Sequence, residues 1–161
     1  MSLYIGVIGS RDCNTDLEKT AYTSGRLIAQ KKWILVCGGM GGIMEYACRG
    51  AHESGGVTIG ILPDNSRKYA NRYLTYSIVT GMGEARNSIV AKSCDAVIAV
   101  SGSFGTLSEI AFAKLNNIPV ISIRSWESGL RGAAEVKLAD YCAETPEEAA
   151  AIIEDLFSSL D

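Results

Sequence analysis

The chain has 161 residues, of which 47% are hydrophobic, and a formal net charge of −3. A chain of this length can bury a core without disulfides or metal, so we expect a single domain over residues 1–161. The acidic balance argues against nucleic-acid and membrane-surface binding, because both require a basic face. No apolar run approaches the ~20 residues that span a bilayer, and no signal-peptide pattern opens the chain. These features predict a cytoplasmic protein.

The five cysteines are odd in number, scattered, and without a CxxC pair. This pattern indicates neither a disulfide framework nor a zinc site. His52 is the only histidine and has no cluster of other ligand types around it. We therefore expect no metal site and interpret the cysteines as structural residues.

Short β-branched runs alternate with amphipathic stretches along the whole chain. In chain order, the pattern predicts a strand over 4–10, a helix over 16–32, a strand over 33–39, a helix over 42–54, strands over 57–63 and 76–81, a helix over 85–94, a strand over 96–102, a helix over 106–117 and a strand over 118–124. Strands buried on both faces have continuous apolar runs, and alternation with helices implies parallel crossovers. The predicted fold is a doubly wound, Rossmann-like α/β sheet, mostly parallel, with helices on both faces. The weak strand at 76–81 has no predicted place in the sheet order.

The last helix has a clear start signal. Thr145 is followed by Pro146 and, three residues on, by Glu148, which is the pattern of a capping box with proline at the first helical position. We expect this helix to pack on the sheet and to carry no chemistry.

Four predicted strand ends are rich in glycine or polar residues: the segments 9–14, 37–42, 80–87 and 101–109. In a parallel sheet these loops emerge at one edge, where ligands bind. Gly9 and Ser10 begin the first of these loops and are candidate ligand-binding residues.

The loops 37–42 and 101–106 each lead from a strand into a helix and have the composition of a phosphate-binding loop. Free N–H groups at a helix N-terminus favour an anion, and glycine lets the backbone approach phosphate oxygens. Ser101, Ser103 and Thr106 add hydroxyl donors. The alternative interpretation is that these glycines only allow tight turns. The chain lacks both GxxxxGK[ST] and GxGxxG, which disfavours a P-loop nucleotidase and a dinucleotide-dependent oxidoreductase and leaves a single phosphate, as in a nucleoside monophosphate.

Arg86 and Glu109 are the candidate catalytic residues. Arg86 follows the loop TGMGEA, and a guanidinium can bind phosphate through two parallel hydrogen bonds. Glu109 follows Thr106 by about one helical turn, and an acid beside an anion site costs electrostatic energy. It could hold ribose hydroxyls or stabilise a cationic sugar during glycosidic cleavage, or it could simply favour a helix N-terminus.

The segments VCGGMGGIMEYACRGA (36–51) and SGSFGTLSE (101–109) resemble the GGGxxGLMxxxxxGA and PGGxGTxxE motifs of the LOG-type phosphoribohydrolases, a superfamily formerly labelled lysine decarboxylase. The resemblance implies a Rossmann-like fold, a homodimer, and release of a base from nucleoside 5′-monophosphates. With GVTIGILP, GMGEARN and GSFGTLSEIAFA, the chain is most similar to the branch that includes molybdenum-cofactor carrier proteins.

The resemblance assigns roles to individual residues. Arg86 matches the catalytic arginine and Glu109 the final glutamate of PGGxGTxxE. The residues that match phosphate-binding positions are Gly38, Gly39, Gly41, Gly42, Gly102, Gly105 and Thr106.

Three departures bear on activity. Arg86-Asn87 stands where the family has Arg-Lys, Ser101-Gly102-Ser103 where it has Pro-Gly-Gly, and Ser108-Glu109 where it has two glutamates. The hypotheses are therefore a phosphoribohydrolase with no required cofactor, a non-catalytic carrier with the molybdenum cofactor or another phosphorylated pterin as cargo, and a nucleotide sensor. Decarboxylation is rejected, because Lys92 and Lys114 show no sign of a pyridoxal phosphate site.

Ligand specificity is expected to depend on the loops 64–73 and 125–132. Tyr73 and Trp126 could stack on a ring, or could equally be packing residues. The small residues of EIAFAKL (109–115) would allow a helix to pack against a second chain, which agrees with the homodimer, although packing within one chain explains them equally well.

Overall fold

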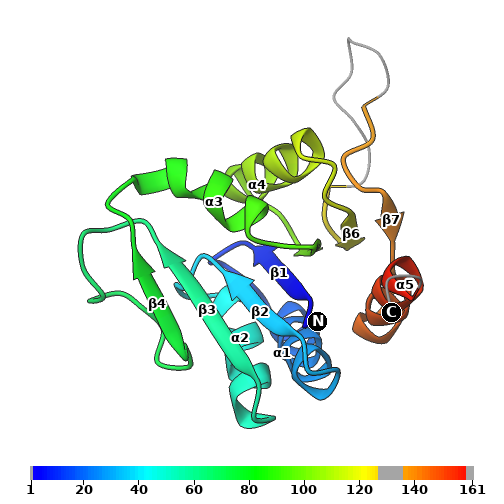
Figure 1. The fold of residues 1–161 in the computed structure, drawn as a ribbon, viewed down its shortest axis with the longest axis horizontal. Helices are drawn as coiled ribbons and strands as arrows, with labels where there is room; N and C mark the ends of the chain where they lie inside the picture. Colours follow the sequence, from blue (N-terminus) through cyan, green and yellow to red (C-terminus); the bar gives the residue numbers. More distant parts are fainter. Residues whose placement is uncertain (1, 127–135, 159–161) are drawn as a thin grey trace.

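In the residues that the computed structural model describes, 2–126 and 136–158, seven parallel strands form one sheet in the order β4-β3-β2-β1-β5-β6-β7 (Figure 1). The strands are β1 (Tyr4–Gly9), β2 (Ile34–Cys37), β3 (Val57–Leu62), β4 (Tyr76–Val79), β5 (Ala96–Val100), β6 (Val120–Ile123) and β7 (Tyr141–Cys142). The helices are α1 (Thr15–Gln30), α2 (Ile43–Glu53), the 3-10 helix η1 (Gly83–Arg86), α3 (Asn87–Lys92), α4 (Phe104–Leu115) and α5 (Pro146–Phe157). The predicted doubly wound α/β fold is confirmed.

The sheet is buried on both faces, which explains its continuous apolar strands. Helices α1, α2 and α5 cover one face of the sheet, and α3 and α4 cover the other (Figure 1). Ile5 and Val7 of β1 belong to the hydrophobic cluster that includes residues of α1, α2 and α5, whereas Ile8 belongs to the cluster that includes residues of α3 and α4. Because successive side chains of a strand point to opposite faces, both faces need apolar residues.

The weak strand is β4, at the edge of the sheet. Within the described residues it pairs with β3 alone, and its Tyr76 and Ile78 are exposed. An edge strand with one open side does not need the continuous apolar run of a central strand. The sequence did not predict β7, because two residues, Tyr141 and Cys142, are too few for a pattern.

The predicted cap of the last helix is confirmed in part. Thr145 Oγ1 accepts the N–H of Glu148 at 3.2 Å, and Pro146 is the first helical residue. The Glu148 carboxylate, however, accepts from the N–H of Glu144 instead of the cap residue. Across the two described ranges, no helix is both long and apolar enough to cross a membrane.

The order of the strands positions the site. The chain runs outward from β1 through β2 and β3 to β4, and then crosses to the other side of β1 to form β5, β6 and β7. The loops that follow β1 and β5 therefore lead into helices on opposite faces. They diverge at the carboxyl edge of the sheet, which is where open α/β sheets bind ligands.

Candidate functional site

A cleft of about 550 Å³ lies at this point of the sheet. Its walls come from the loop after β1, from η1 and the start of α3, and from the first turns of α4. The lining residues are Gly9, Ser10, Arg11, Asp12, Met44, Glu84, Arg86, Asn87, Ser103, Phe104, Gly105, Thr106, Ser108 and Glu109. The volume falls within the range of small-molecule sites, roughly 300–1,000 Å³.

Arg86 and Glu109, the two predicted catalytic residues, meet at the base of the cleft. Arg86 Nη1 lies 3.3 Å from Glu109 Oε1, and the two residues are only 4% and 6% exposed. Arg86 comes from the end of η1 and Glu109 from α4, so the helices on this face of the sheet bring them together. Such a buried pair loses hydration on both partners, and replacing one of them would leave a buried charge.

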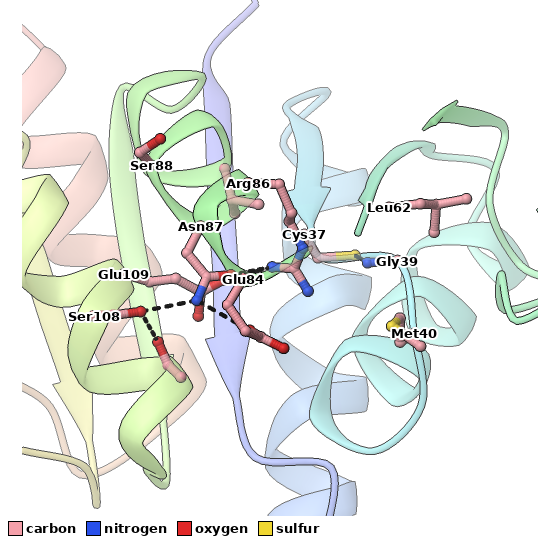
Figure 2. A network of polar contacts seen from close by, with 12 residues as sticks. Cys37, Gly39, Met40, Leu62, Glu84, Arg86, Asn87, Ser88, Ser108 and Glu109 are labelled. Atoms are coloured by element: carbon pink, nitrogen blue, oxygen red, sulfur yellow. Dashed lines mark hydrogen bonds and ion pairs between the residues drawn. The ribbon is translucent and has the colours of Figure 1, made fainter. Parts of the chain in front are cut away.

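Asn87 joins Arg86 to α4. Its Oδ1 accepts from Arg86 Nη1 at 2.5 Å, and its Nδ2 donates to Ser108 Oγ at 2.8 Å and lies 3.5 Å from Glu84 Oε2 (Figure 2). Ser108 Oγ donates in turn to the carbonyl of Gly105 at 2.7 Å. The two departures from the family motifs, Asn87 and Ser108, are thus in direct contact.

The guanidinium of Arg86 has unused donors. Its Nε is buried and has no hydrogen-bond partner among residues 2–126 and 136–158. Nη1 makes the bonds to Asn87 and Glu109, and no bond from Nη2 is formed within the described part of the chain. An unmade hydrogen bond of a buried donor costs about 1–3 kcal/mol. The residue therefore has spare capacity for an anionic ligand.

The carboxyl group of Glu109 is perturbed by its surroundings. Burial raises its pKa to about 7 from an ordinary value near 4.5, and the Glu84 carboxylate acts in the same direction, while Arg86 opposes the shift. A carboxyl group that titrates near neutral pH can hold or release a proton under physiological conditions.

The N-terminus of α4 opens into the cleft. Ser103 precedes the helix, and its N–H donates to Thr106 Oγ1 at 3.3 Å. The N–H groups of Phe104 and Gly105 donate to no acceptor within the described residues. Helix α4 begins at Phe104, two residues earlier than predicted, and the residues of its first turn line the cleft together with Arg86. The positive end of the helix dipole therefore lies at the cleft.

The second predicted phosphate loop, 37–42, has a different environment. None of its glycines is among the residues that line the cleft. The first N–H of α2, that of Ile43, donates to the carbonyl of Ser10 at 3.1 Å, and a Cβ on Gly42 would lie 2.3 Å from the carbonyl oxygen of Arg11. The loop after β1 thus covers the N-terminus of α2. The phosphate-binding role predicted for the loop 37–42 stays a prediction.

Several of these glycines are required for packing. A Cβ on Gly38 would lie 2.7 Å from Arg86 Nη2, so this glycine makes room for the guanidinium. Gly39 has a φ of +75°, and its carbonyl accepts the N–H of Asn71 at 2.9 Å. For a Cβ on Gly41, by contrast, the nearest atom of the described residues is Glu45 Oε2, at 3.8 Å. The first two are needed for close approach and a left-handed turn.

The loop after β5 also divides into two parts. Ser103, Gly105 and Thr106 line the cleft, whereas Ser101 and Gly102 do not. Ser101 has a φ of +59°, its carbonyl accepts from Ser125 Oγ, and a Cβ on Gly102 would lie 2.4 Å from Trp126 Nε1. These two residues turn the backbone toward α4. The phosphate-binding role predicted for them stays a prediction.

Sequence reasoning missed several lining residues. Arg11 and Asp12 lie in the polar loop after β1, and Glu84 lies in the segment TGMGEARN. Both segments were predicted to lie at the ligand-binding edge of the sheet, so this position was the signal that could have identified the three residues. Phe104 is 86% exposed at the start of α4. The Arg11 guanidinium donates to Met40 Sδ at 3.0 Å and so lies along one side of the cleft.

The other residues discussed in the sequence analysis lie away from the cleft or outside the described residues. Tyr73 packs beside one core cluster, with Arg72 over its ring at 4.9 Å, and Trp126 packs against the core cluster on the other face of the sheet. Neither residue is among those that line the cleft. Of the segment 125–132, residues 127–132 lie outside the described residues.

The Cys37 and Cys48 thiols are 3.4 Å apart in the core. Among the described residues, no group of His, Cys, Asp and Glu is arranged to hold a metal ion.

A model of the SLOG cluster4 family matches residues 2–152. The chain belongs to the SLOG cluster4 family. The matched range includes the two segments that resemble the phosphoribohydrolase motifs, 36–51 and 101–109, as well as Arg86. The LOG-like Rossmann superfamily indicated by the sequence is therefore confirmed.

Two solved structures of molybdenum-cofactor proteins are similar over 98% of this chain. The molybdenum cofactor binding protein of Rippkaea orientalis is 34% identical, with a TM-score of 0.86 and 98% of each chain covered. The molybdenum cofactor carrier protein of Chlamydomonas reinhardtii is 32% identical, with a TM-score of 0.83, and the match covers 98% of this chain and 99% of that one.

Sequence relatives include both an uncharacterized protein and enzymes. A protein of Archaeoglobus fulgidus is 42% identical over 76% of this chain and 80% of its own length. The cytokinin riboside 5′-monophosphate phosphoribohydrolase LOG5 of Arabidopsis thaliana is 29% identical over 66% of this chain. The chain spans only about half the length of that enzyme, 49%.

Proposed function

We propose that this protein binds a phosphorylated small molecule in the cleft and releases it unchanged, with the molybdenum cofactor as its cargo. The cofactor contains a pterin and a phosphate group, so a cleft that recognises a phosphate beside a flat ring suits it. The first turn of α4 and the guanidinium of Arg86 would hold the phosphate, because both offer donors with no acceptor among the described residues.

The observation that carries this proposal is the neutral pair Asn87–Ser108. The phosphoribohydrolase motifs have a lysine and a second glutamate at these positions, and here an amide and a hydroxyl are hydrogen-bonded at 2.8 Å. The pair keeps Arg86 in place and lacks both the second cation and the second acid. Such a site can bind an anion but has fewer charged groups with which to stabilise a transition state.

The comparisons support the same choice. The two molybdenum-cofactor proteins match this chain over nearly its full length, whereas the phosphoribohydrolase match covers about two thirds of this chain and half of the enzyme. What those proteins bind supports the proposal by analogy of fold and site.

The test is a binding experiment with the cargo itself. Molybdenum cofactor released from a denatured molybdoenzyme is mixed with the protein under anaerobic conditions, and the mixture is separated by gel filtration. Pterin and molybdenum eluting together with the wild type, and lost with Arg86→Ala, support the proposal. Pterin that elutes only in the small-molecule fraction overturns it.

A second candidate is a phosphoribohydrolase, and the buried carboxyl of Glu109 favours it. In its ionised form, Glu109 could stabilise a cationic sugar while Arg86, 3.3 Å away, orients the phosphate. A pKa of about 7 would also let Glu109 pass a proton to the leaving base near neutral pH. In glycosidic hydrolysis, water attacks the anomeric carbon, and the base leaves with the bond electrons and a proton.

The second candidate is tested with a panel of nucleoside 5′-monophosphates and chromatography for free base and ribose 5-phosphate. Release of base that disappears with Glu109→Gln would establish hydrolysis and replace the carrier proposal. With no release from any member of the panel, the carrier remains.

A further inference from the structure

A second hollow of about 410 Å³ adjoins the cleft. It is lined by Arg11, Met40, Pro63, Asp64, Tyr69, Gly83 and Glu84. Arg11 and Glu84 line both spaces, so the second hollow continues the first instead of forming a separate site. A ligand whose phosphate lies at the start of α4 could therefore extend into it.

The walls of this hollow suit a flat ring. Tyr69 is 60% exposed, with the Lys68 ammonium 5.2 Å from the centre of its ring. The Met40 thioether, which accepts from Arg11, and Pro63, which is mostly buried, line the hollow as apolar groups. An exposed aromatic ring beside a thioether offers stacking and sulfur–aromatic contacts to a heterocycle.

The polar group that could recognise the edge of such a ring is the carboxylate of Asp64. It is exposed and makes no hydrogen bond or ion pair within the described ranges. Its backbone is held in place, because its carbonyl accepts the N–H of Gly81 at 3.1 Å, and the carbonyl of Pro63 accepts the N–H of Gly83 at 3.0 Å. The other carboxylate, that of Glu84, already lies 3.5 Å from Asn87 Nδ2.

A carboxylate only accepts hydrogen bonds, so it selects ring edges that carry donors. Guanine and pterin present a ring N–H beside an exocyclic amino group, which match the two carboxylate oxygens. Adenine presents a ring acceptor beside its amino group, and that acceptor would face the negative charge.

We infer that this hollow takes the ring of the bound ligand, stacked on Tyr69, and that Asp64 selects an edge with a ring N–H beside an amino group, as in pterin or guanine, over adenine. The inference rests on the proposed function, because it needs the phosphate in the cleft. It makes Asp64 and Tyr69 specificity-determining residues and assigns a role to the loop 64–73.

The test uses GMP, IMP, AMP and ribose 5-phosphate as probes in isothermal titration calorimetry. GMP is expected to bind at least ~10-fold more tightly than AMP, with IMP, which lacks the amino group, between them. Asp64→Asn should lower the affinity for GMP by ~10-fold and leave the affinity for ribose 5-phosphate unchanged. Unchanged binding of ribose 5-phosphate also shows that the variant is folded. Tyr69→Leu should lower the affinity for all three nucleotides.

Asp155→Asn is the control for the change in charge, since Asp155 is exposed on α5 and lines neither space. Equal binding of GMP and AMP, with ribose 5-phosphate bound, would overturn the ring inference and leave the phosphate site standing. No binding of any probe would overturn the phosphate site and, with it, both proposals.

Discussion

Asn87 and Ser108 are 21 residues apart in sequence and are hydrogen-bonded, Nδ2 to Oγ, at 2.8 Å. Both positions carry charged residues in the phosphoribohydrolase motifs. The two substitutions relative to those motifs, which look independent in the sequence, are therefore in direct contact in the structure. The neutral pair connects the start of α3 to α4 and supports the guanidinium of Arg86 (Figure 2).

The contact predicts coupling between the two positions. Asn87→Lys alone should reduce the free energy of unfolding by about 3 kcal/mol, because it places a second cation beside the buried Arg86. Adding Ser108→Glu should restore at least about 1 kcal/mol of that loss, measured by urea denaturation of the two single variants and the double variant. Strictly additive costs would contradict the pairing.

Glu109 should make stability depend on pH. Its pKa is about 7 in the folded protein, against an ordinary value near 4.5, so the folded state binds more protons than the unfolded state between these pH values. The wild type should therefore lose stability relative to Glu109→Gln as the pH rises from 5 to 8, by about 2 kcal/mol. Denaturation of both proteins at the two pH values measures this difference, and Asp155→Asn serves as the control. Parallel profiles for wild type and Glu109→Gln would show that the carboxyl is not perturbed.

Two neighbouring glycines provide a matched pair of variants. Gly38→Ala should weaken ribose 5-phosphate binding by ~10-fold, because its Cβ would lie 2.7 Å from Arg86 Nη2 and displace the guanidinium. Gly41→Ala should bind as the wild type does, since the nearest described atom to its Cβ, Glu45 Oε2, would lie 3.8 Å away, an ordinary contact distance. Calorimetry of both variants is the measurement. Equal affinities would mean that the position of the guanidinium does not matter for the phosphate.

A homodimer is expected to use the exposed apolar side of α4. Phe104 and Leu115 are 86% and 77% exposed, and a separation of 11 residues places them on one face of a helix. Leu115→Glu should convert a dimer to a monomer at micromolar concentration, as measured by sedimentation velocity. A wild type that sediments as a monomer would contradict the dimer.

The strands of the sheet were largely predictable because burial on both faces imposes a local, continuous apolar pattern. The edge strand β4 lacks that pattern, and β7 is too short to show one. Arg86 and Glu109 were predicted from the sequence as site residues, and in the structure Arg86 Nη1 lies 3.3 Å from Glu109 Oε1.

The roles of the glycines could not be inferred in the same way. Phosphate-binding glycines and packing glycines have the same local sequence, and the difference depends on distant residues. Gly38 is distinguished by Arg86, 48 positions later, and Gly42 by the backbone of Arg11. Only the packing of the loop after β1 shows that the α2 N-terminus is covered, while that of α4 is open.

The most direct measurement is the identification of what the protein holds when it is purified anaerobically from cells that make the molybdenum cofactor. Mass spectrometry and metal analysis of the denatured protein should find a phosphorylated pterin and molybdenum in similar amounts in the wild type, and neither in Arg86→Ala. Wild-type protein that is empty of both, from cells whose molybdoenzymes are loaded, would contradict the carrier function.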